Sequence, residues 1–456
     1  MSRMAICGVV ATVTFVIIIS VVVSVVSFGG STKGAVRGSS LISNNEYAQQ
    51  QPSEDGNDEV AATAAAAAAS DEPLSPQEQE RFDTIRKTIL QQHISTTQSL
   101  SDTSSPQYAA VVWLSQGHDE LQETESVYLM QRYGLAVLWF STTRSEHQWH
   151  MTKQETSSGV GEEQDNNRLV YDNQGQRDRK SIQYHDPKEW FRHNNWLSSS
   201  DICTWEGIAC HTHKEGNDTQ NDTTNNGLVA SIELRRNNVQ GLLPEEIYLS
   251  LPSLKVLDLS DNGIAGTISS KISNWANLEY LNYTSNNLAG SLPSQIGNLP
   301  SLREMHLAMN QLGNSIPHTI GNISRLKHLD LSGNMLRGTI PYTIGNLEEL
   351  SALDLSWNAL DGPLPHEMSR MQTLVTLDVA HNDLVGPLLL ELSGVRYLSV
   401  LRLNDNHLSG EVPTEIGSLV HLEELRLNNN DFRGFLPSEI SNLVGLGKYQ
   451  SLKIVA

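Results

Sequence analysis

The second half of the sequence repeats one pattern at an almost constant interval, and asparagine marks each repeat. The first two asparagines are 25 residues apart, and each later one follows after 24 residues. The nine positions are Asn237, Asn262, Asn286, Asn310, Asn334, Asn358, Asn382, Asn406 and Asn430. A fixed period of this length indicates a solenoid, in which each repeat buries its apolar face only against its neighbours. The period favours a binding function but names no ligand.

Each interval carries the pattern LxxLxLxxNxLxGxIPxxIGxL, which residues 326–341 show in full. Alternation in Leu329-Asp330-Leu331 predicts a short strand with leucines inward and aspartate outward. Stacked copies would form a parallel sheet, with the rest of each repeat as the crossover. The inward asparagine amide can satisfy backbone groups where the chain turns. The glycine four residues later suits a tight bend, and Asn314 takes that place in the fourth repeat.

This pattern resembles the plant-type leucine-rich repeat over residues 228–456. The resemblance implies an α/β fold: a right-handed solenoid with a concave parallel β-sheet, preceded by a helical N-terminal cap region. Members of this family mostly bind proteins, peptides or glycans. Residues 449–454 begin a tenth strand whose asparagine would lie beyond Ala456. We therefore expect nine repeats, a truncated tenth, and a longer natural chain. The alternative is that another chain covers the apolar end of the last repeat.

Residues 75–227 are predicted to contain helices that lead into a cysteine-containing segment. Ser75 and Ser105, each followed by proline, are helix starts, and a third helix is expected over 123–141. The predicted inward residues are Phe82, Ile85, Ile89, Val127, Met130, Leu135 and Leu138. Residues 151–181 are polar and predict a loop.

The chain has three cysteines. Cys7 lies in an apolar segment, whereas Cys203 and Cys210 lie close together, which favours one disulfide and an oxidising compartment. The alternative is a zinc site, but a structural site needs four ligands, so we predict no metal and no cofactor. The ligands of the alternative zinc site would come from Cys203, Cys210, His193, His211 and His213.

Trp190, Trp196 and the run Cys203-x-Trp205-x-Gly207-x-x-Cys210 resemble the N-terminal cap of plant-type leucine-rich repeat proteins. The resemblance departs at Ile208, where valine is usual. Such a cap covers the apolar end of the first repeat, which has no upstream neighbour. Together with the preceding helices, it is similar to diatom and other algal leucine-rich repeat proteins.

Residues 5–28 contain no charged side chain and are long enough for a membrane helix. We expect a single-pass signal-anchor over 1–28, with a cleaved signal peptide as the alternative. Residues 29–74 are polar and alanine-rich, which predicts a disordered linker. Flanking charges do not fix the orientation. Sequons and the cysteine pair favour an extracellular or lumenal array over a cytosolic one. The sequon asparagines are Asn217, Asn221, Asn282 and Asn322.

Ligand contacts are expected where the repeats differ. The strand-centre row comprises Glu233, Asp258, Asn282, His306, Asp330, Asp354, Asp378, Arg402 and Arg426. Its three consecutive aspartates and two arginines predict a binding track that changes sign. The alternative is that aspartate is simply common at this strand position. A glycan on Asn282 would block part of this face.

The turn row directly precedes each repeated asparagine and comprises Arg236, Asp261, Ser285, Met309, Gly333, Trp357, His381, Asp405 and Asn429. Trp357 is the strongest candidate contact, because tryptophan is enriched among interface hot spots. The alternative is that its ring folds over a neighbouring residue. Met309 is a further candidate, and His306 and His381 can make binding pH-dependent. The alternative is that these two histidines are ordinary polar surface.

No catalytic pattern of a metalloprotease, serine hydrolase, nucleotide-binding loop or kinase is present. The net charge of −21 argues against a nucleic-acid partner. The prediction is a membrane-tethered, receptor-like protein without enzyme or kinase activity. It would bind a protein, peptide or glycan on the concave face, with a possible signalling co-receptor. The alternative is a structural or adhesion scaffold of a wall or matrix.

Overall fold

The computed structural model describes residues 73–116, 126–143, 190–198, 200–211, 227–388 and 393–443. The predicted membrane segment, the linker up to residue 72, the polar loop and the tenth strand lie outside these residues, as do His213, Asn217 and Asn221. Across the described ranges, no helix combines the length and apolar character that crossing a membrane requires.

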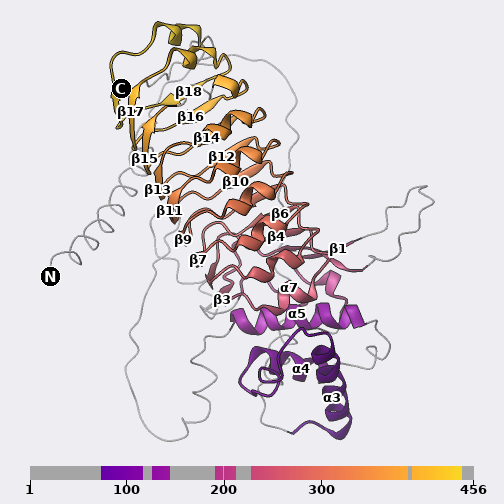
Figure 1. Cartoon of the computed structure of the whole chain (residues 1–456). Coiled ribbons are helices and arrows are strands. Elements are labelled where there is room, and N and C mark those ends of the chain that lie inside the picture. Colours follow the sequence, from indigo (N-terminus) through magenta and orange to yellow (C-terminus); the bar gives the residue numbers. More distant parts are fainter. Residues whose placement is uncertain are drawn as a thin grey trace, which may run out of the picture. The chain divides into compact units, whose positions relative to one another are not determined.

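The repeats stack into two sheets that run the length of the array (Figure 1). Over the described residues, the first sheet has ten strands in the order β1-β2-β4-β6-β8-β10-β12-β14-β16-β18. Its pairs are parallel except β1–β2, which is antiparallel. Its strands are β1 (Ile208–Cys210), β2 (Val229–Glu233), β4 (Val256–Asp258), β6 (Tyr280–Asn282), β8 (Glu304–His306), β10 (His328–Asp330), β12 (Ala352–Asp354), β14 (Thr376–Asp378), β16 (Val400–Arg402) and β18 (Glu424–Arg426).

The second sheet contains nine parallel strands among the described residues and was not predicted. Each strand follows a repeated asparagine and ends near the glycine. Its strands are β3 (Gln240–Leu242), β5 (Gly263–Gly266), β7 (Asn287–Ser291), β9 (Gln311–Asn314), β11 (Met335–Thr339), β13 (Ala359–Gly362), β15 (Asp383–Pro387), β17 (His407–Glu411) and β19 (Asp431–Arg433).

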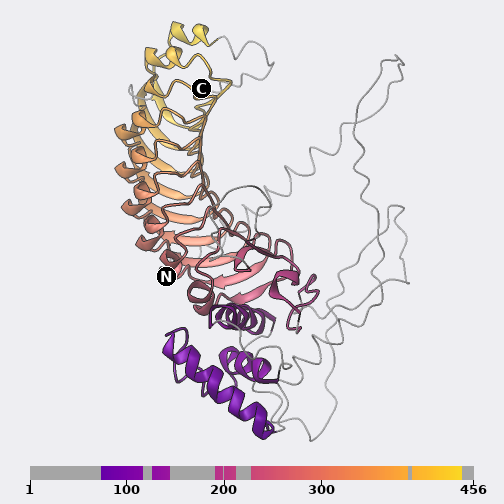
Figure 2. The same cartoon turned by 90° about the vertical axis from the view of Figure 1, so that its right-hand side faces the viewer.

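Short helical turns complete the repeats, on the other side of the array from the first sheet (Figure 2). One is the α-helix α7 (Glu246–Ser250), and the others are 3₁₀ turns that start after a proline or serine in extended conformation. The 3₁₀ turns are η4 (Ser270–Asn274), η5 (Ser294–Asn298), η6 (His318–Asn322), η7 (Tyr342–Asn346), η8 (His366–Arg370), η10 (Thr414–Ser418) and η11 (Ser438–Asn442).

One apolar core runs through the array between these layers. In the repeat around β10, Leu326, Leu329 and Leu331 are buried, while Asp330 points out of the core and is half-buried. The core therefore follows the predicted alternation, and the leucine-rich solenoid with a parallel sheet is confirmed. The glycine position adopts positive φ in every repeat, and Asn314 has φ 60° there.

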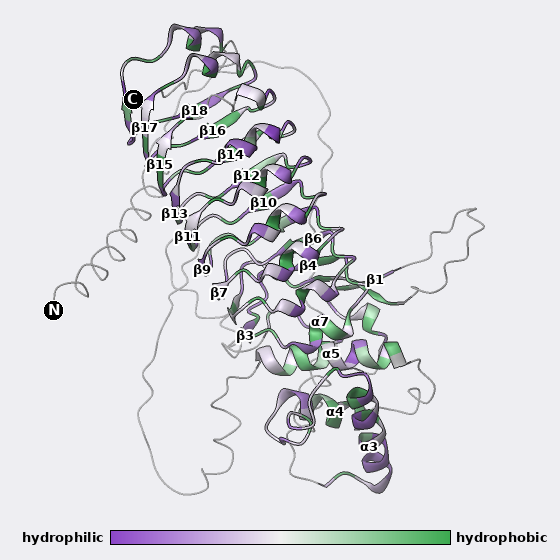
Figure 3. Cartoon of the chain, viewed as in Figure 1, coloured by the Kyte–Doolittle hydropathy of each residue, from purple (hydrophilic) through white to green (hydrophobic). Residues whose placement is uncertain are grey.

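Three helices precede the array: α3 (Pro76–Gln91), α4 (Pro106–Gln116) and α5 (Ser126–Thr143). Ser75 and Glu78 form the expected reciprocal cap of α3. α4 contacts α3 and α5, and α5 contacts α7 and β3. α4 and α5 are accordingly more hydrophobic than α3 (Figure 3). The expectation for Val127 was wrong: it is 40% exposed, because it lies in the first turn of α5.

Side-chain hydrogen bonds join this helical region to the array. Gln131 on α5 accepts a 2.6 Å hydrogen bond from the Val229 backbone N–H of β2. The Ser95 hydroxyl donates to the buried Glu246 carboxylate at 2.7 Å, and burial raises the pKa of Tyr133, which bonds to the same hydroxyl.

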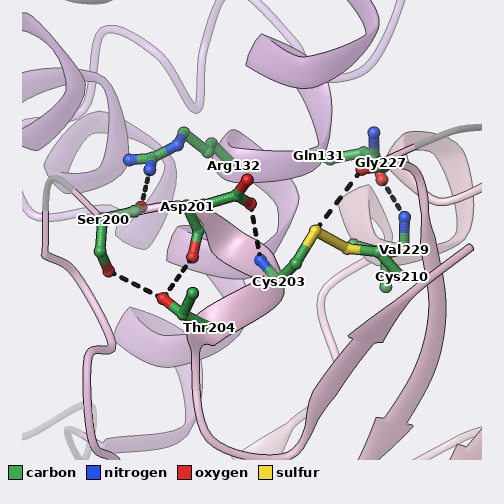
Figure 4. Close-up of a disulfide and its surroundings, with 9 residues drawn as sticks. All are labelled: Gln131, Arg132, Ser200, Asp201, Cys203, Thr204, Cys210, Gly227 and Val229. Atoms are coloured by element: carbon green, nitrogen blue, oxygen red, sulfur yellow. Dashed lines mark hydrogen bonds between the residues drawn. A yellow bond between two sulfur atoms is a disulfide. The ribbon is translucent and has the colours of Figure 1, made fainter. Parts of the chain in front are cut away.

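A disulfide joins Cys203 to Cys210 beside these helices (Figure 4). Asp201 caps the 3₁₀ turn η2 (Ile202–Thr204), because its carboxylate accepts a 2.9 Å hydrogen bond from the backbone N–H of Cys203. Arg132 of α5 donates to the Ser200 carbonyl, so the helix and the cysteine segment are tied together.

Five tryptophans form the interior next to the disulfide. Trp190, Trp196 and Trp205 are buried, and the Trp196 ring centroid lies 4.7 Å from that of Trp190 and 5.1 Å from that of Trp205. Trp139 of α5 and Trp113 of α4 join them, at 4.8 Å from Trp190 and 6.0 Å from Trp205. The segment and the helices therefore share one core.

Candidate functional site

The repeated asparagines lie under the surface and bind backbone groups of two successive repeats. The Asn334 amide donates to Leu307 of the previous repeat at 3.0 Å and to its own Leu331 at 3.0 Å. Its carbonyl accepts the Leu312 backbone N–H at 3.0 Å. Because these side chains are hydrogen-bonded to the backbone, they are not available for ligand contacts.

The turn row has an unexpected backbone conformation. All nine residues, from Arg236 to Asn429, have φ between 52° and 63°. Glycine, asparagine and aspartate tolerate this left-handed region, but a bulky residue there is an outlier and costs about 1–2 kcal/mol. Arg236, Met309, Trp357 and His381 are bulky residues in this conformation, which recurs in all nine repeats and so belongs to the turn of the repeat. The frequency of Gly, Asn, Asp and Ser in this row was the sequence signal for it.

Trp357 is both exposed and supported from below. Half of its surface is open to solvent, and its ring stacks on His381 with centroids 3.8 Å apart and planes 22° apart. The ring therefore folds over a neighbouring residue, as the alternative expected, and the ligand contact stays a prediction.

His381 is in turn held by Asp405. Its Nε2 lies 3.4 Å from the Asp405 carboxylate, which also accepts hydrogen bonds from Asn404 and Asn429 at 2.6 Å each. Burial of Asp405 opposes its ionisation, but the two amides and His381 outweigh it and lower its pKa. Together, Trp357, His381, Asp405 and Asn429 form a connected surface over four repeats.

Met309 is 62% exposed and leans over the next repeat. Its sulfur lies 2.7 Å from where a Cβ on Gly333 would be. The missing side chain at Gly333 therefore makes room for the thioether, and the apolar surface of Met309 lies between Gly333 and solvent.

The acidic part of the strand-centre row is occupied by local hydrogen bonds. Asp330 accepts from the Ser332 N–H at 3.0 Å and hydroxyl at 2.7 Å, and Asp354 binds Ser356 in the same way. Burial, and then the like charges of the neighbouring aspartates, raise the pKa of Asp354 despite these bonds. This geometry favours a structural role for the aspartates over a binding track.

The two arginines of the row are also paired. Arg402 donates to Glu424 at 2.9 Å through two nitrogens and to the buried Asp378 at 3.1 Å. Arg426 lies 2.5 Å from the same Glu424. The hydrogen bond from Arg402 is the main cause that lowers the pKa of Glu424. The positive end of the track is therefore largely neutralised.

His306 lies in a cluster that the two rows did not reveal. Its Nε2 is 3.4 Å from Glu304 on the same strand, and His328 on β10 is 3.8 Å from that carboxylate. Tyr280 on β6 contacts the His306 ring at 5.6 Å.

The two described sequon asparagines differ in access. Asn282 is half-buried on β6, and its amide donates to the Tyr280 hydroxyl at 3.0 Å. Asn322 is exposed at the end of η6. Of the alternative zinc ligands, the two cysteines are bonded to each other and His211 bonds to the Ser253 carbonyl.

Sequence-family models agree with the repeat assignment. Models described as leucine-rich repeats match residues 252–312, 300–360 and 324–384, and residues 397–419 and 421–443. The chain carries leucine-rich repeats. A comparison with curated proteins found no match to the chain.

Solved structures with similar leucine-rich repeats include a plant receptor. The leucine-rich repeat ectodomain of the membrane receptor kinase GASSHO1/SCHENGEN3 from Arabidopsis thaliana, in complex with CASPARIAN STRIP INTEGRITY FACTOR 2, is 32% identical with a TM-score of 0.50. The match covers 54% of this chain and only 28% of that one.

Two further similar structures are less close in TM-score. The Arabidopsis receptor kinase HAESA, in complex with the peptide hormone IDA and the co-receptor SERK1, has 29% identity, coverage of 52% and 42%, and a TM-score of 0.41. A plant ice-binding protein has 25% identity, coverage of 54% and 82%, and a TM-score of 0.43. The resemblance to a plant receptor ectodomain rests on the structure with the TM-score of 0.50.

Proposed function

We propose that this chain is a receptor-like recognition protein that binds an extended peptide segment along the turn row. The observation that carries the proposal is the setting of Trp357. Its side chain is half-exposed, its backbone is in the left-handed region, and its ring stacks on His381, which Asp405 holds in place. A rigid aromatic ring loses little entropy when it contacts a ligand, which is why tryptophan dominates many interfaces.

The dimensions of the row fit such a ligand. Neighbouring strands are about 4.8 Å apart, so the six residues from Met309 to Asn429 span about 24 Å. An extended peptide rises about 3.3 Å per residue, so about seven residues cover this distance. The likeness to a receptor ectodomain solved with a bound factor supports a protein or peptide ligand.

The test is selection of peptides from a randomised phage-displayed library on the purified full chain. Selected peptides are then measured against Trp357→Ala and against Tyr342→Ala, which removes a 64% exposed aromatic ring on η7. We expect Trp357→Ala to weaken binding by about 30-fold, the equivalent of a hot spot of about 2 kcal/mol. Tyr342→Ala should leave binding unchanged.

Two results would contradict the proposal: equal losses in both variants, or selected peptides that bind Trp357→Ala as tightly as wild type. Absence of any selected peptide would favour the alternative of a structural or adhesion scaffold. A glycan ligand or a signalling co-receptor remains an extension of the same proposal, which arrays of carbohydrates and of receptor ectodomains would test.

The proposal places the repeats outside the cytosol, tethered by residues 5–28 without a kinase. Asn322 supports this arrangement, because it is an exposed sequon on the helical side of the array. Enzymatic deglycosylation of the membrane fraction should reduce the mass of the chain, and Asn322→Gln should remove one glycan. Asn346→Gln, an exposed asparagine outside a sequon, is the matched control. An unchanged mass would count against this topology.

The proposal also gives the segment from Trp190 to Cys210 and its helices the role of an N-terminal cap. Support comes from the shared tryptophan core and from the hydrogen bond of Gln131 to β2. Replacing both cysteines with serine should increase hydrogen exchange first in β2 and β4, because the apolar end of the array loses its cover. Unchanged exchange there would refute the role.

A further inference from the structure

Three metal-binding side chains meet on the face of the first sheet. Glu304 and His306 are two residues apart on β8, so their side chains point to the same side. His328 on β10 pairs in register with Glu304. The potential ligand atoms of all three lie within 4.8 Å of one another.

The spacing suits a small divalent cation. Zinc binds histidine nitrogen and carboxylate oxygen at about 2.0–2.2 Å in a tetrahedron, which puts neighbouring ligand atoms about 3.3 Å apart. The Glu304 oxygen lies 3.4 Å from His306 Nε2 and 3.8 Å from His328 Nδ1. Small side-chain rotations are enough to close this geometry, because all three side chains are only partly buried.

The surroundings also favour a cation. The backbone N–H groups of Lys327 and His328 donate to the Arg303 carbonyl, which fixes β10 against β8. Asp330 lies in register opposite His306 and adds negative charge beside the cluster. Arg303, the cationic side chain that precedes Glu304, lies 3.6 Å from the Glu279 carboxylate.

We infer that Glu304, His306 and His328 form a binding site for Zn²⁺ or a similar divalent metal that prefers nitrogen ligands. Two imidazoles and one carboxylate are a known ligand set for zinc with an open fourth position. Mg²⁺ and Ca²⁺ prefer oxygen ligands alone, so the two imidazoles select against them. The site does not depend on the proposed peptide ligand.

The test is calorimetric titration of the chelator-treated full chain with zinc sulfate. Histidines elsewhere contribute equally to wild type and variants, so the difference between the isotherms isolates this site. Compared with the triple variant E304Q/H306A/H328A, wild type should bind one more equivalent. Each single variant should lose at least about tenfold in affinity, because even second-shell changes cost about 10–100-fold.

His381→Ala is the matched control, because His381 also lies 3.4 Å from a carboxylate but belongs to no cluster of three potential metal ligands among the residues that the structure describes. It should leave the zinc isotherm unchanged. Zinc should raise the unfolding temperature of wild type and of His381→Ala. Zinc should raise the unfolding temperature of the triple variant by less than it raises that of wild type or His381→Ala, because only binding at the other histidines remains.

Unfolding in EDTA checks that the variants are folded, and Glu304→Gln preserves side-chain shape if an alanine variant proves unstable. Equal stoichiometry and affinity in wild type and the triple variant would overturn the inference. Binding of Mg²⁺ as tight as that of Zn²⁺ would also overturn it, because Mg²⁺ prefers oxygen ligands and the two imidazoles should select against it.

Discussion

Replacing Asn382 tests whether the asparagine ladder holds the repeats together through its amide. The Asn382 amide donates to the carbonyls of Leu355, Val379 and Ala380 at 3.0, 3.1 and 3.2 Å. Its carbonyl accepts the Leu360 backbone N–H at 3.0 Å. The side chain is buried, so Asn382→Ala removes four contacts that water cannot easily replace.

The cost is not the sum of four bonds, because the ladder is shared. The Leu355 carbonyl keeps a hydrogen bond from Asn358 at 3.1 Å, and the Val379 carbonyl keeps one from Asn406 at 3.0 Å. The Leu360 N–H, however, loses its acceptor inside the core. An unsatisfied buried group costs about 1–3 kcal/mol, and the lost net hydrogen bonding adds about 1. We therefore expect about 2–4 kcal/mol.

Asn382→Asp separates the donor role from side-chain size. Aspartate has nearly the same shape, but its carboxylate has no donor and would face the same three carbonyl oxygens. At neutral pH it should be more destabilising than alanine, since an unpaired charge is buried. Asn346→Ala, at an exposed position on η7, should change stability by less than about 0.5 kcal/mol.

Denaturant unfolding measures the free-energy change, and hydrogen exchange at the Leu360 amide measures the local effect. Exchange is needed because a repeat array can unfold in parts, so one global value can hide a local loss. An aspartate variant as stable as wild type would refute the donor argument. So would an alanine variant in which Leu360 stays fully protected.

Three other predictions concern the repeats. Gly338 and Gly362 have the same φ of 74°. A Cβ added at Gly338 would lie 3.7 Å from its nearest neighbouring atom, and one added at Gly362 would lie 2.7 Å from its nearest neighbouring atom. Denaturant unfolding should give about 1–2 kcal/mol for Gly338→Ala and more for Gly362→Ala. The hydrogen bond from Arg402 is the first cause that lowers the pKa of Glu424. The ionised Glu424 carboxylate therefore stabilises the fold above the unfolded pKa of about 4.3, and this stability is lost as pH falls through the folded pKa. Arg402→Met should flatten this part of the plot of unfolding temperature against pH. Burial raises the pKa of Asp354. The stability that protonated Asp354 contributes to the fold is therefore fully present below about pH 3.9 and is lost as pH rises through the folded pKa. Asp354→Asn should raise the unfolding temperature at neutral pH, and the difference from wild type should disappear in acid.

The array was predictable because its information is local and repeated. A strand such as Leu329-Asp330-Leu331 needs only its own alternation and a copy 24 residues away, and the buried leucines follow that alternation. Ser75 likewise marks α3 through a cap made within four residues. The second sheet was missed although alternation was present, as in buried Leu336 between exposed Met335 and Arg337.

Contacts between distant segments were beyond local patterns. Trp113 of α4 packs against Trp205, and Trp139 of α5 packs against Trp190. No local sequence pattern around either helical tryptophan predicts these long-range contacts. His328 was missed as a partner of His306 for a related reason. It belongs to the first position of its strand, so comparing strand centres alone never brings it beside Glu304.

The turn row shows which unit of sequence specifies the candidate surface. Met309 leans over Gly333, and Trp357 stacks on His381, in each case towards the residue 24 positions later. The exposure of a side chain in this row therefore depends on the next repeat. A larger residue at position 333 would displace the thioether of Met309 without any change to Met309 itself. The shape of the candidate surface is therefore encoded in pairs of successive repeats. Under the proposed function, a substitution is expected to alter binding one repeat away from the residue that contacts the ligand.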